Sequence, residues 1–128
     1  MRFMMLVKAS KDSEADKMPD AQVVAAVMQY REELKQAGVL LDVAALQPPA
    51  ESTRIRFSGG KGIVTDGPFA ETKEVIGGYW LISVKSKAEA IEWAKRAPQS
   101  CGAGQEWAIE LRQLRELEEF QLAVTKVA

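Results

Sequence analysis

The apolar residues of this chain follow two periods, and the two kinds of segment alternate along the sequence. Phe3, Met5 and Val7 interleave with Met4 and Leu6, which predicts a first strand with two apolar faces, as in a strand covered on both sides. Further strands are predicted over residues 39–46, 53–57, 63–65, 79–84 and 107–111. The segment 79–84 is apolar on both faces, so we expect it at the centre of a sheet.

Helical spacing separates these strands, and capping or breaking residues bound the helices. A first helix is predicted from the apolar positions Val23, Val27, Tyr30 and Leu34. We expect Asp20 to be its N-cap and Gly38 to end it. Ser86-Lys87-Ala88-Glu89 is a capping box for a second helix, which Pro98 stops. Leu114, Leu117, Phe120 and Val124 predict a short charged helix at the end.

The middle of the chain predicts a hairpin inserted between two β-α-β halves. Thr53, Ile55 and Phe57 alternate with Arg54 and Arg56, which indicates a half-buried strand with one basic face. A turn over residues 58–61 returns the chain to the strand 63–65. Two β-α-β halves favour an α+β fold of the ferredoxin-like type, with helices on one face of the sheet. The other face would be bare, and a homodimer packed face to face is its simplest cover.

Composition places the chain among ordinary globular proteins. It has 128 residues, the size of one domain, with 47% hydrophobic and 27% charged residues. A net charge of -1 gives no attraction to a polyanion, so no direct nucleic-acid partner is expected. The first apolar run ends at Lys8, and no run approaches the roughly 18 residues of a membrane span. We therefore expect a soluble, cytoplasmic protein with no membrane contact.

The residue types exclude several kinds of chemistry. The chain has no histidine, so neither a Ser-His-Asp nor a Cys-His device can form. Its single cysteine, Cys101, can form no internal disulfide and no thiolate cluster. The run Gly59-Gly60-Lys61-Gly62 lacks the spacing of a phosphate-binding loop and fits a hairpin turn. We expect no cofactor, neither a tightly bound metal nor a dinucleotide.

The densest cluster of reactive residue types is the loop from Asp66 to Glu74. Asp66 ends a strand, and Lys73 is close enough in sequence to return to it, so the pair is a candidate catalytic set, with Asp66 as general acid or base. In the alternative, structural interpretation, Asp66 bonds backbone N–H groups of its own turn, Pro68 sets that turn and Phe69 fills the core.

A second set of residues could contact a ligand. Arg54 and Arg56 share a strand face and could hold an anion, although a solvated edge strand explains them as well. Glu71 and Tyr79 are further candidates for contact with a small organic ligand. A solvated charged segment is the alternative for Glu71.

The run from Gly62 to Glu74, which contains Asp66-Gly67-Pro68-Phe69, resembles the signature of the YCII-related, or DGPF-domain, family. The opening Met1-Arg2-Phe3-Met4, Gly77-Gly78-Tyr79 and Ile109-Glu110-Leu111-Arg112 match the family in the same order. The resemblance covers residues 1–113 as the domain and leaves residues 114–128 as a charged helical tail. It implies a ferredoxin-like, dimeric α+β barrel.

The resemblance leaves two functions open. Distant relatives resemble small lyases that eliminate chloride from hydroxyquinones with an Asp and a His, and Asp66 would be the equivalent aspartate. Without a histidine that pair is incomplete here. Other members are similar to proteins encoded beside or fused to extracytoplasmic-function sigma factors. The chain is thus either a small-ligand-binding or accessory module, with a link to transcription, or a cofactor-free lyase- or isomerase-like enzyme.

Overall fold

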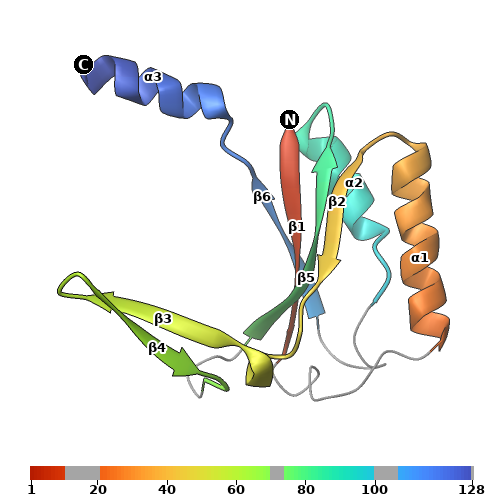
Figure 1. Cartoon of the computed structure of the whole chain (residues 1–128). Coiled ribbons are helices and arrows are strands. Elements are labelled where there is room, and N and C mark those ends of the chain that lie inside the picture. The colour runs from red at the N-terminus through yellow and green to blue at the C-terminus, as the bar shows by residue number, and fades with distance from the viewer. Residues whose placement is uncertain (11–20, 70–73, 100–106, 128) are drawn as a thin grey trace.

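The structure, a computed structural model, describes residues 1–10, 21–69, 74–99 and 107–127. Its elements follow the predicted order (Figure 1). The strands are β1 (Arg2–Ser10), β2 (Leu40–Ala45), β3 (Thr53–Ser58), β4 (Lys61–Asp66), β5 (Glu74–Ser83) and β6 (Trp107–Gln113). The helices are α1 (Ala21–Gln36), the 3-10 turn η2 (Pro49–Glu51), α2 (Lys87–Lys95) and α3 (Leu117–Val127). None of the helices in these ranges is long and apolar enough to cross a membrane.

Four of the strands form one antiparallel sheet in the order β2-β5-β1-β6. Each β-α-β unit is therefore split, because β5 lies between β1 and β2 and pairs with both. This arrangement confirms the α+β class and the central position of the segment 79–84, and it agrees with the predicted ferredoxin-like order. The strands β3 and β4 form a separate two-stranded sheet, the predicted inserted hairpin.

The core lies between the sheet and the two helices α1 and α2, which cover the same face (Figure 1). Phe3, Met5 and Val7 of β1 point into it, as do Trp80 and Ile82 of β5. The helices contribute Tyr30, Leu34 and Ala90. No described helix lies against the opposite face of the sheet in Figure 1, which agrees with the prediction that the helices cover one face and leave the other bare within one chain.

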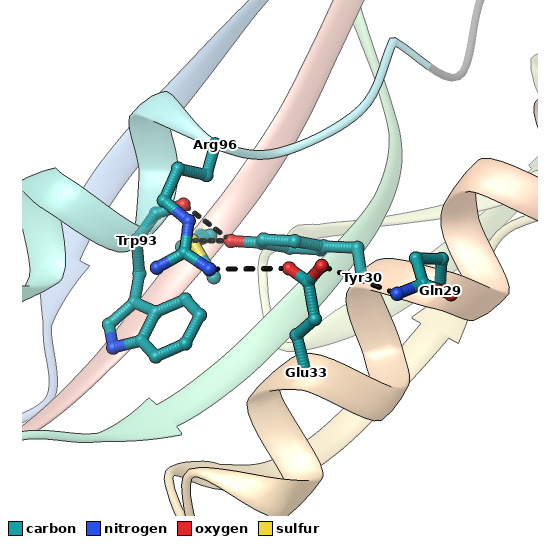
Figure 2. A network of polar contacts seen from close by, with 6 residues as sticks. Gln29, Tyr30, Glu33, Trp93 and Arg96 are labelled. Carbon is teal, nitrogen blue, oxygen red and sulfur yellow. Dashed lines mark hydrogen bonds and ion pairs between the residues drawn. The ribbon is translucent and has the colours of Figure 1, made fainter.

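Tyr30 ties α1 to α2 in the centre of this core (Figure 2). Its hydroxyl donates a hydrogen bond of 2.6 Å to the carbonyl oxygen of Trp93, and its ring meets Trp80 edge to face at 5.0 Å. Burial raises the pKa of Tyr30 to about 12, because the phenolate would lose its hydration. Next to Tyr30, the guanidinium carbon of Arg96 lies 4.3 Å from the centre of the Trp93 ring. The same guanidinium forms an ion pair of 3.3 Å with the Glu33 carboxylate.

Two helix ends are set by the predicted residues, the end of α1 and the start of α2, whereas α2 ends at Lys95, before the predicted stop at Pro98. Gly38 follows α1 with φ of 73°, a conformation that side chains disfavour. Ser86 accepts a hydrogen bond of 3.1 Å from the Glu89 amide, and the Glu89 carboxylate accepts one of 2.9 Å from the Lys85 amide. The capping box is thus confirmed. Its second bond, from the Glu89 carboxylate, reaches the amide of Lys85, the residue before the N-cap, instead of the amide of the N-cap itself. The predicted N-cap Asp20 lies outside the described residues.

The prediction of a half-buried hairpin is wrong within one chain. Every residue of β4 and all but one of β3 are exposed, because the hairpin extends away from the four-stranded sheet instead of joining it (Figure 1). Gly59 and Gly60 form its turn with positive φ values of 58° and 80°. The helix α3, predicted at the end of the chain, also extends away from the sheet and is exposed along its described side chains.

Candidate functional site

The uncovered side of the four-stranded sheet, here called the open face, carries the side chains that alternate with the core. Because Phe3, Met5 and Val7 point into the core, Met4, Leu6 and Lys8 lie on the open face. Cross-strand pairing extends it to two rows, Asp42–Leu81–Met4–Arg112 and Ala44–Tyr79–Leu6–Glu110. Met4, Leu6 and Leu81 are half-buried. The open face is therefore apolar at its centre and charged along its edge strands.

Two polar pairs are formed on this face. The hydroxyl of Tyr79 donates a hydrogen bond of 2.9 Å to the Oδ2 atom of Asp42. This bond raises the pKa of the Tyr79 hydroxyl above its ordinary value, because it favours the neutral phenol. On the other side, the Nζ atom of Lys8 lies 3.4 Å from the Oε1 atom of Glu110. Tyr79, a predicted ligand contact, thus lies on the open face with a carboxylate beside it.

Asp66 lies at the base of the hairpin, where β4 ends. Its Oδ1 atom accepts a hydrogen bond of 3.0 Å from the Thr53 hydroxyl, and the residue is exposed. The amide of the next residue, Gly67, donates 2.7 Å to the Ser52 carbonyl oxygen. A side chain on Gly67 would meet the Pro49 carbonyl oxygen, so this corner requires a glycine. The geometry places Asp66 beside a tight backbone crossing.

The predicted ligand-binding arginines lie on the other face of the hairpin. Thr53 pairs with Asp66 and Arg54 with Thr65, and successive side chains alternate, so Asp66 and Arg54 point to opposite faces. The guanidinium of Arg54 stacks 3.8 Å above the ring of Phe69, and Arg56 is exposed on the same face as Arg54. The structure does not bring these arginines to Asp66.

Phe69 differs from its prediction. It is half-buried under Arg54 and is not part of the main core, because the hairpin base lies apart from the helix-covered side of the sheet. Glu71 and Lys73 lie outside the described residues, so the predicted pairing of Lys73 with Asp66 stays a prediction.

The residue that sequence reasoning missed is Asp42. It lies in the apolar strand β2, and its hydrogen bond to Tyr79 gives the open face a donor–acceptor pair. The available signal was a single carboxylate inside the run Leu40-Leu41-Asp42-Val43, since charged residues are depleted in strands unless they face water or a partner.

A small apolar pocket lies on the opposite, helix-covered side of the sheet. It has a volume of about 110 Å³ and is lined among the described residues by Val27, Val43, Trp80, Pro98 and Trp107, together with neighbouring residues that lie mostly in β2 and β5. No carboxylate or cation of the described residues lines it. It could take only a small apolar group, and it offers no acid or base.

Comparison with known proteins gives two findings. The family model described as the YCII-related domain matches residues 1–115. An uncharacterised protein from Rhizobium meliloti (strain 1021) is 38% identical over 86 residues, which is 67% of this chain and 69% of that protein.

Proposed function

This chain belongs to the YCII-related domain family, and we propose that it is a small-ligand-binding module that acts as a homodimer and holds its ligand at the open face. The observation that carries the proposal is the open face itself. It combines an apolar centre, Met4, Leu6 and Leu81, with the bonded pair Tyr79–Asp42.

The composition of the open face supports a second copy as its cover. Its charged residues include the cations Lys8 and Arg112 and the acids Asp42 and Glu110. A surface that carries both signs can pair with itself under a two-fold axis, because each cation of one copy can approach an acid of the other. The half-buried apolar centre would then be removed from water on both copies, which stabilises association.

The pair Tyr79–Asp42 supports a polar ligand rather than an inert interface. The Tyr79 oxygen donates to Asp42 and can still accept a hydrogen bond, and the Asp42 carboxylate, whose Oδ1 atom already accepts one of 2.9 Å from the Val43 amide, has further lone pairs. Enclosed between two sheets, these remaining acceptor positions favour a ligand that carries donors, since hydrogen bonds to a charged carboxylate are among the stronger ones. A small organic molecule with a hydroxyl or N–H group on an apolar body would donate to these acceptors and would also pack against the apolar centre of the open face. The acid–base role of Asp66 and the link to sigma factors stay predictions.

A ligand screen by thermal shift and two-dimensional NMR tests this proposal. The variants Tyr79→Phe and Asp42→Asn remove the polar pair, and Gln36→Ala on exposed α1 is the matched control. A ligand at one hundred times its Kd should stabilise the wild type by about 2.7 kcal/mol. The same ligand should bind the two site variants with a Kd at least tenfold higher. It should bind the control variant with the wild-type Kd. Equal binding to all variants, with shifts confined to the pocket around Trp107, would refute the open face as the site.

A further inference from the structure

The open face leaves an acid and a cation without an opposite charge, at opposite edges of the sheet. Asp42, in the edge strand β2, accepts hydrogen bonds of 2.9 Å from the Tyr79 hydroxyl and from the Val43 amide. It forms no ion pair with any described residue. Arg112, in the other edge strand β6, is exposed and has no ion pair within the described ranges either. Each residue therefore still has room for a partner of the opposite sign.

The two residues occupy the same row of the sheet. The register places Asp42 beside Leu81, Leu81 beside Met4, and Met4 beside Arg112. The row thus begins with an acid, ends with a cation and is apolar between them. Three strand spacings separate its ends, roughly 14 Å, so Asp42 and Arg112 of one chain are too far apart to bond each other.

A second copy that covers the open face can do so about two kinds of two-fold axis. Sheets packed in the aligned way keep their strands within about 30° of each other, so the axis runs either along the strands or across them. An axis across the strands sets each strand against the same strand of the partner. Neither β2 nor its neighbour β5 contains a lysine or arginine, so Asp42 would be enclosed without a cation. An uncompensated buried charge opposes association.

An axis along the strands, midway between β5 and β1, exchanges the two edges of the sheet instead. β2 of one copy then faces β6 of its partner. Because this rotation keeps each position along the strands, Asp42 faces the partner's Arg112 in the same row, and Met4 faces the partner's Leu81. Packed sheets lie about 10 Å apart, a gap that a long arginine and a short aspartate side chain can span together. Opposite charges meet twice, and the apolar centres cover each other.

We infer that the partner's Arg112 completes the site at Asp42 and Tyr79, twice in each dimer. This inference rests on the homodimer of the proposed function, and it adds the direction of the symmetry axis and one residue of the site. The guanidinium has more N–H donors than a single carboxylate can accept. Its remaining donors lie beside the Tyr79 hydroxyl, so the site gains a position for a carbonyl or carboxylate group of the ligand.

Cross-linking of mixed full-length chains tests which residues face each other. In a Cys101→Ser background, one chain carries Asp42→Cys and another Arg112→Cys, and a short bismaleimide joins cysteines without demanding disulfide geometry. The mixed dimer keeps one of the two ion pairs, and we expect at least tenfold more cross-linked dimer from the mixture than from either chain alone. Met28→Cys, on α1 and itself 53% exposed, is the matched control and should not join Arg112→Cys. Cross-linking of either chain with itself as strongly as in the mixture, or equal cross-linking of the control, would overturn the inference.

Charge reversal tests the ion pair through the dimer dissociation constant. Asp42→Lys and Arg112→Glu should each raise this constant at least tenfold, because each sets like charges against each other twice in the dimer. The chain that carries both substitutions has opposite charges across the interface again, and its constant should return to within about threefold of the wild-type value. Met28→Glu should change the constant less than twofold. A double variant that dimerises as weakly as the single ones contradicts the pairing.

Leu81→Glu separates this inference from the proposed function. It places a charge at the apolar centre of the open face and leaves Asp42 and Arg112 in place, so it tests the homodimer alone. A dimer that Leu81→Glu disrupts but whose dissociation constant is unchanged by both charge reversals overturns the role of the partner's Arg112 and leaves the homodimer intact. A wild type that is monomeric at millimolar concentration overturns both.

Discussion

The Tyr30 hydroxyl offers a measurable test of how the core joins α1 to α2. Tyr30→Phe removes the donor of the 2.6 Å bond to the Trp93 carbonyl and leaves the ring in place. That carbonyl oxygen also accepts a bond of 3.1 Å from the Arg96 amide, so it keeps one partner. The loss should therefore be near the low end for a buried hydrogen bond, about 1 kcal/mol of unfolding free energy at pH 7.

The same hydroxyl makes stability depend on alkaline pH. The pKa of Tyr30 is raised to about 12 in the folded protein, whereas an unfolded tyrosine titrates near 10. Because the folded state disfavours the phenolate, this contribution is fully present below pH 10 and is lost as the pH rises from 10 to 12. At pH 11.5 the loss amounts to about 2 kcal/mol.

Urea unfolding at pH 8 and pH 11.5, at one fixed protein concentration, measures this effect. Other groups also titrate there, so the informative quantity is the difference between variants. The wild type should lose about 2 kcal/mol more than Tyr30→Phe over this interval. The comparison variant is Tyr79→Phe, which removes the other tyrosine; its pKa is also raised, by the bond to Asp42, but at an uncovered position, so this variant should differ from the wild type less than Tyr30→Phe does. A Tyr30→Phe variant that loses stability as steeply as the wild type would refute the assignment.

Three further predictions concern the hairpin base and α3. Gly67→Ala places a methyl group against the Pro49 carbonyl oxygen, so it should lower stability by about 1–3 kcal/mol in urea unfolding; a change below about 0.5 kcal/mol would contradict the close approach. Asp66→Asn keeps an acceptor for Thr53 at an exposed site, so it should change stability by less than about 0.5 kcal/mol; if ligand affinity also survives in the folded variant, Asp66 has no functional role. Arg2 holds the pKa of Glu116 below its ordinary value, so their bond is present above that value and is lost as the pH falls through the lowered pKa. NMR shifts of α3 should change over this acidic interval, and Glu116→Gln should abolish that change; an unchanged titration would show that the pair does not hold the helix.

The main sheet could be predicted from the sequence because its signals are local and agree with one another. Gly38, the capping box at Ser86 and the apolar run 79–84 each fix one element, and the order of elements then limits the topology. The hairpin could be located but not placed. Its alternating pattern indicates that one face of the hairpin is apolar. The pattern is the same whether that face is covered by this chain or by another one, so it does not predict the position of the hairpin.

The candidate site could be predicted only in part, for a related reason. The run Asp66-Gly67-Pro68 fixes a turn, and the crossing at Pro49 explains its glycine. Residue types alone gave no indication that Asp66 and Arg54 point to opposite faces of the hairpin, since this depends on the register of β3 with β4. The partner of Tyr79 was also missed, because Asp42 lies 37 residues away in sequence and only the strand pairing brings them together.

The two parts of the candidate site become one problem once the second copy is considered. Asp66 is at the base of the β3–β4 hairpin, and Tyr79 and Asp42 are on the open face. Neither surface is covered by the described part of its own chain, although both carry apolar side chains beside a carboxylate. A carboxylate gains a raised pKa or a defined ligand geometry mainly when water is removed from it. In the homodimer of the proposed function, which covers the open face, chemistry at Asp42 should therefore depend on protein concentration in the range of the dimer dissociation constant, whereas a structural role of Asp42 should not.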